Sequence, residues 1–128
     1  MYKKTVTFTD YNGNQRTKDC YFNLNKVECT QLQVSTKEAF DEHIKKIVES
    51  EDKEAIFDIF NKIILKAYGE KSEDGLRFVK SDKISEEFSQ TEAYVEVFMD
   101  IATNPTSAEE FIKGTFPSDF VKQIPQSK

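Results

Sequence analysis

The 128-residue sequence has no Trp, only one His, two Cys, four Gly and three Pro. His43, Cys20 and Cys29 cannot form a four-ligand zinc site without the help of carboxylates. The glycines stand too far apart to form a phosphate-binding loop, and residues 70–75 are acidic but lack the order of a calcium-binding EF-hand. The sequence therefore predicts no catalytic residues, no cofactor and no metal site, so we expect a protein that is not an enzyme.

Long apolar runs are also missing. The most apolar stretch, Ala55 to Tyr68, is too short and too polar to span a bilayer. The first ten residues, MYKKTVTFTD, lack the apolar segment of a signal peptide. We therefore expect a cytoplasmic protein, in which both cysteines remain reduced thiols.

Acidic residues outnumber basic ones, 23 to 18, which gives a net charge of −5 and an isoelectric point near 5.0. Binding to nucleic acid or to an anionic membrane requires clustered Lys and Arg, so neither is expected as a partner. An acidic surface favours solubility and association with basic proteins.

The N-terminal residues predict a β-hairpin. Residues 3–9 alternate, with Val6 and Phe8 on one face, and Asn12-Gly13 is a strong turn signal before a return strand from Gln15 to Leu24. Capping residues and apolar spacing predict that helices follow. Their expected starts are Asn25, Ser35, Ser50 or Asp52, Ser81, Thr91 and Ser107.

Three glycines and one proline help to set the expected boundaries. Gly69 is predicted to end the longest helix as a left-handed cap, Asp74-Gly75 to form a turn, and Gly114 to end the last helix. Asn104-Pro105 is expected to stop the helix before it. Between these boundaries, apolar residues after the turn are expected to return to the core: Leu76, Phe78 and Val79.

Together these elements predict an α+β fold, with the N-terminal β-hairpin packed on a mainly α-helical core that has the helix of residues 55–68 at its centre. Residues 1–117 are expected to form one domain. Residues 118–128 are expected to form a C-terminal tail, for which the sequence leaves open an ordered or a flexible state.

Apolar residues beyond the last capped helix are the candidates for binding a partner: Phe116, Phe120, Val121 and Ile124. Phe120 and Ile124 are four positions apart, so one helical turn can present both to a groove. The alternatives are that these residues pack on the core of the chain itself or are disordered. The edge of the hairpin is a second candidate, either for a partner or for self-association.

Two stretches resemble a known family. The sequences YGEKSEDGLRFVKS (68–81) and EEFSQTEAYVEVFMDIATNPTSAEEFIKGTFP (86–117) resemble the tail assembly chaperones of siphoviruses and of related prophages in Gram-positive hosts. The resemblance extends more loosely to the opening hairpin and to the FDIFNKIILKAYGEKS region. Leu76 departs from it, because a second charged residue is expected before Arg77.

The resemblance implies a function that the residues alone do not reveal. Such chaperones bind the long helical tape measure protein, keep it soluble and help to recruit tail tube subunits in the host cytoplasm, and they are absent from the finished virion. Many have a longer form made by translational frameshifting, so residues 116–128 would lie near the junction in the short product. The alternative is a structural tail or head–tail component that stays in the virion.

Overall fold

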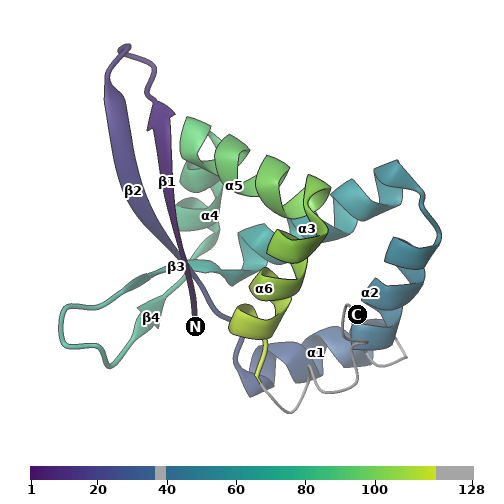
Figure 1. The fold of residues 1–128 in the computed structure, drawn as a ribbon. Coiled ribbons are helices and arrows are strands. Elements are labelled where there is room, and N and C mark those ends of the chain that lie inside the picture. The colour runs from purple at the N-terminus through teal and green to yellow at the C-terminus, as the bar shows by residue number, and fades with distance from the viewer. Residues whose placement is uncertain (37–39, 118–128) are drawn as a thin grey trace.

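The computed structural model describes residues 1–36 and 40–117. Strands lie on one side of the molecule and helices on the other, so the predicted α+β class is confirmed (Figure 1). Along the chain the elements are β1 (Tyr2–Thr9), β2 (Gln15–Phe22), α1 (Lys26–Thr36), α2 (Phe40–Glu49), α3 (Lys53–Ala67), β3 (Tyr68–Lys71), β4 (Phe78–Val79), α4 (Asp82–Ser89), α5 (Glu92–Thr103) and α6 (Pro105–Thr115).

The predicted hairpin is confirmed and forms the largest part of an antiparallel sheet with the order β1-β2-β3-β4. Gly13 occupies the turn with a φ of 84°, a backbone conformation that residues with a Cβ rarely adopt. Asp10 holds this turn, because its carboxylate accepts hydrogen bonds from the backbone amides of Asn12 and Asn14 and from Arg16. Val6 and Cys20 are buried on the inner face, as the alternation predicted.

The prediction for Gly69 is wrong. Helix α3 ends at Ala67, and Tyr68 is already extended, so the chain enters β3 directly and pairs with β2. Gly69 is required by close packing rather than by a left-handed turn, because a Cβ there would lie 2.8 Å from both the Phe78 ring and the Val79 carbonyl oxygen. The turn at Gly75 is confirmed by its φ of 77°.

Leu76 was expected in the core, but its side chain is 83% exposed at the tip of the hairpin formed by β3 and β4. Phe78 and Val79 are half-buried in β4. The prediction for Leu76 failed because β4 is only two residues long, and the pattern of so few residues does not show which of them is the first to be buried.

Most of the predicted helix starts are confirmed. Asn25 and Glu28 form a reciprocal capping box at α1, in which each side chain accepts a hydrogen bond from the backbone amide of the other residue. Asp52, Ser81 and Thr91 cap α3, α4 and α5. The predicted start at Ser35 is wrong, because α1 continues through Thr36, and residues 37–39 lie outside the described part of the chain.

Helix α6 starts earlier than predicted. Asn104, not Ser107, is its N-cap, and the Asn104 Oδ1 accepts hydrogen bonds from the amides of Thr106 and Ser107. Pro105 occupies the first turn, where its missing N–H costs nothing. The prediction that Gly114 ends this helix is wrong, because α6 continues to Thr115. Gly is required at this position by close packing, since a Cβ there would lie 2.9 Å from the Tyr2 ring.

The core is centred on aromatic rings. The Phe22 side chain is 0% exposed, and its ring centroid lies 5.6–6.2 Å from the centroids of the four other rings. We call these five residues the aromatic centre: Tyr2, Phe22, Tyr68, Phe88 and Phe111. Helices α3 and α5 pack beside it, and α5 also lies along β1 (Figure 1).

Candidate partner-binding groove

Of the four residues predicted to bind a partner, the structure describes only Phe116, and it is 4% exposed. Its amide donates a hydrogen bond to the Ile112 carbonyl at the end of α6. The Leu24 amide donates to the Thr115 carbonyl and thereby ties this end of the helix to the segment after β2. Phe116 therefore belongs to the core rather than to an open surface. Phe120, Val121 and Ile124 lie outside the described residues.

The two thiols are buried away from solvent. Cys20 and Cys29 are both 0% exposed, and burial raises the pKa of each thiol to about 11. Thiols with so high a pKa are protonated at neutral pH and are weak nucleophiles.

His43 belongs to α2, but its side chain lies outside the described part. Among the described residues, no three His, Cys, Asp or Glu side chains gather closely enough to hold a metal ion.

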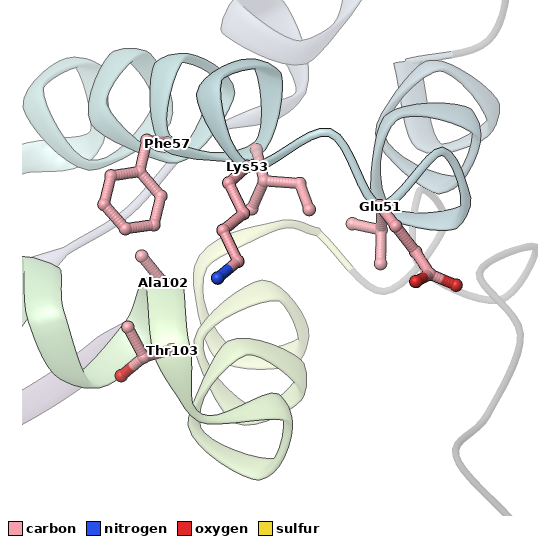
Figure 2. Close-up of a pocket in the computed structure, with 7 residues that line it drawn as sticks. Glu51, Lys53, Phe57, Ala102 and Thr103 are labelled. Atoms are coloured by element: carbon pink, nitrogen blue, oxygen red, sulfur yellow. The ribbon is translucent and has the colours of Figure 1, made fainter.

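An open groove lies where the connection from α2 to α3 approaches the C-terminal end of α5. It encloses about 460 Å³. Figure 2 shows Phe57 on α3 pointing towards Ala102 on α5, with Lys53 beside Phe57 and Glu51 farther along the connection. We call it the α3–α5 groove, lined by Val48, Glu51, Lys53, Ile56, Phe57, Ala102 and Thr103.

The connection at one end of the groove is short and sharply bent. The Ser50 amide donates to the Lys46 and Ile47 carbonyls, which closes α2. Glu51 then takes a φ of 57°, and Asp52 caps α3 by accepting a hydrogen bond from the Ala55 amide. A residue other than Gly in this left-handed region costs about 1–2 kcal/mol. The bend brings Val48, near the end of α2, to the same groove as residues of α3.

Most of the residues that line the groove are apolar, and contacts behind them hold them in place. The Phe57 ring meets the Phe98 ring edge-on, with centroids 5.2 Å apart. Tyr94 also links the two helices, because its hydroxyl donates a hydrogen bond to the Asn61 side-chain oxygen. The walls are therefore fixed by packing between α3 and α5.

Exposed apolar side chains extend the groove. Val48 is 44% exposed at one end, and Met99 and Val95 are 45% and 41% exposed along α5. Met99 precedes Thr103 by four residues, so the two share one side of the helix. The apolar surface thus continues from the groove along α5, and we call Val95 and Met99 the α5 stripe.

The chain segment that forms the α2–α3 side of the groove is acidic. Between residues 49 and 58, a single basic residue, Lys53, stands among five acidic ones, and all six are exposed. We call the five the acidic rim: Glu49, Glu51, Asp52, Glu54 and Asp58. Their negative potential favours a ligand with positive charge at its edges.

Sequence reasoning missed this groove because it assigned the apolar residues of these helices to the core. The signal was present in residues 55–68, whose apolar side chains nearly encircle the helix. The sequence does not show that the neighbours of α3 cover only part of that circumference and leave Ile56 and Phe57 half-buried.

The fold and the groove define a small α+β domain with a partly exposed apolar surface beside an acidic rim, a combination typical of sites that bind another polypeptide. A family model described as phage tail assembly chaperone matches residues 1–128, so the chain belongs to the phage tail assembly chaperone family. This confirms the resemblance to phage tail assembly chaperones drawn from residues 68–81 and 86–117. Comparison with curated proteins and with solved structures gave no match.

Proposed function

We propose that this chain binds the tape measure protein of its phage, keeps it soluble and helps to recruit tail tube subunits around it. It acts by binding rather than by catalysis, in the host cytoplasm, and leaves before the virion is complete. The observation that carries the proposal is the family match over residues 1–128.

The surface of the molecule supports this role. A long helical protein with apolar stripes aggregates unless those stripes are covered. The α3–α5 groove offers a half-exposed apolar surface for this purpose, and a net charge of −5 keeps the resulting complex soluble. Many copies on one long chain reach a high total affinity although each site binds weakly, so tube subunits can displace them one by one.

Co-expression with the tape measure protein of the same phage, followed by affinity pull-down, tests the proposal. We expect the tape measure protein to become soluble and to co-purify with several copies of this chain. A tape measure protein that stays insoluble, beside a chain that purifies alone, would contradict the proposal. Detection of the chain in purified virions would favour the structural alternative.

A further inference from the structure

We propose that the α3–α5 groove and the α5 stripe bind one amphipathic helix of the partner, apolar on one face and carrying Lys or Arg along the edges of that face. The inference rests on the proposed function in one respect, because it assigns this helix to the tape measure protein. The groove and its charge can be tested without that assignment.

The apolar part of the surface offers exposed side chains against which a helix can dock. Helices dock through side chains spaced three and four residues apart, which enter an apolar groove. Phe57 and Ala102 line the groove from α3 and α5, and Val48 and Met99 are each nearly half exposed, so the surface is open to solvent rather than a closed cavity. The volume of the groove is about 460 Å³.

The acidic residues around the groove determine which charges the bound helix should carry. Within the acidic rim, Glu51 lines the groove itself, beside Lys53, and the other four carboxylates are exposed on the surrounding segment of residues 49–58, where five acidic residues outnumber one basic residue. A helix with acidic edges would place like charges against the rim, which is unfavourable, whereas Lys or Arg at the same positions would pair with it. The rim is exposed, so salt should weaken this part of the attraction.

The groove is formed before the partner arrives. Phe57 is held against Phe98, and Tyr94 is bonded to Asn61, so the facing helices need not rearrange. A preformed site loses less conformational entropy on binding. Glu51 keeps the left-handed conformation that bends the chain at the end of the groove, and backbone strain of this kind is concentrated at functional sites.

Two designed peptides test the chemistry on the full chain. Both carry the same Leu stripe at helical spacing, and the stripe is flanked by Lys in one peptide and by Glu in the other. Fluorescence anisotropy should show the Lys-flanked peptide binding at least tenfold more tightly than the Glu-flanked one. Equal binding of the two, or no binding of either, would overturn the proposal.

Groove variants separate docking from simple attraction between opposite charges. V48S/M99S should weaken binding of the Lys-flanked peptide at least tenfold, whereas the control L76S changes an apolar residue that is 83% exposed on the β3–β4 hairpin and should have no effect. E49K should weaken binding more than E73K, which makes the same change of charge on that hairpin. Equal losses within each pair would show attraction to overall charge only and overturn the proposal.

The same peptides and variants of the chain distinguish two other occupants of the α3–α5 groove. Tighter peptide binding by F120S/I124S would assign the groove to the end of this chain, and self-association that V48S/M99S abolishes would assign it to a second copy. Either result overturns the proposal. If the peptide results hold but the tape measure pull-down fails, the groove keeps its helix-binding role and the proposed function falls.

Discussion

The aromatic centre and the α3–α5 groove are built from the same kinds of residue but differ in how completely they are covered. Phe22 is 0% exposed and lies among four other rings, supplied by β1, β3, α4 and α6. Within the described part of the chain, Phe57 has one ring contact, with Phe98, and it remains half-buried beside an open groove. The aromatic centre is covered by other side chains on all sides, whereas the α3–α5 groove is covered only on the side opposite its opening.

This difference in burial indicates which apolar residues of the chain are available for a function other than folding. Burying apolar surface stabilises the fold by about 25 cal/mol per Å², so apolar residues left half exposed forgo part of that stabilisation. Val48 does so in the groove and Met99 does so on α5, four residues before the lining residue Thr103. We infer that the aromatic centre supports the fold, whereas the groove is kept open for a partner.

The largest effect on stability is expected from Phe22→Ala. Removing a ring that four others contact leaves a cavity, so the free energy of unfolding should fall by about 3–5 kcal/mol. Urea unfolding followed by circular dichroism measures this loss. A loss below about 1 kcal/mol would mean that the aromatic centre can collapse around the cavity, contrary to the contrast drawn here.

Gly69→Ala should have the next largest effect. The added Cβ would meet the Phe78 ring and the Val79 carbonyl at 2.8 Å, and overpacking of this kind costs about 1–3 kcal/mol. The matched control is Glu70→Ala in the same strand, where the side chain is exposed. Equal melting temperatures for the two variants would show that β4 shifts freely.

The sequence predicted the parts of the fold that depend on local chemistry. The hairpin turn at Asn12-Gly13 and the caps at Asp52, Ser81 and Thr91 follow from neighbouring residues alone, and all are confirmed. Gly69 and Gly114 were misread because Gly serves both helix ends and close contacts. Their actual neighbours are Phe78, on the paired strand, and Tyr2, at the other end of the chain, and no local pattern predicts either contact.

The candidate site was harder to predict than the fold. Apolar spacing identifies the residues of α3 and α5 that avoid water, but it does not distinguish a residue covered by this chain from one left for a partner. Phe116 follows the last helix and lies in the core, which is the alternative that the sequence left open for it. In both cases the burial of the residue depends on contacts between elements far apart in the sequence.

An ion pair between β1 and α5 gives a smaller effect that depends on pH. Lys4 Nζ lies 2.5 Å from Asp100 Oδ2. Partial burial alone would raise the pKa of Asp100, but the hydrogen bonds from Lys4 and Ser107 outweigh it and lower the pKa below its usual 3.8. The pair therefore adds stability above about pH 4, which is lost as the pH falls through the folded pKa.

Asp100→Asn should accordingly lower the free energy of unfolding by about 1 kcal/mol at pH 7, and the difference from the unmodified chain should shrink towards about pH 2. Chemical unfolding at a series of pH values measures it. Asp58→Asn, in the acidic rim, is the control for loss of an exposed carboxylate. A difference that persists unchanged at low pH would rule out the ion pair as its source.

The smallest effect per site on stability is expected from V48S/M99S. Both side chains are nearly half exposed, so the free energy of unfolding should change by only about 0.5 kcal/mol per site. Thermal unfolding measures this change beside that of Phe22→Ala. A loss as large as that of Phe22→Ala would show that the groove supports the fold as the aromatic centre does.

The most direct test of the account is a pull-down of the co-expressed tape measure protein by three forms of the full chain. The unmodified chain and L76S should both retain the tape measure protein in the soluble fraction, whereas V48S/M99S should remain folded yet lose most of it. Equal recovery by all three forms would contradict the central claim that the open groove, rather than the rest of the surface, holds the partner.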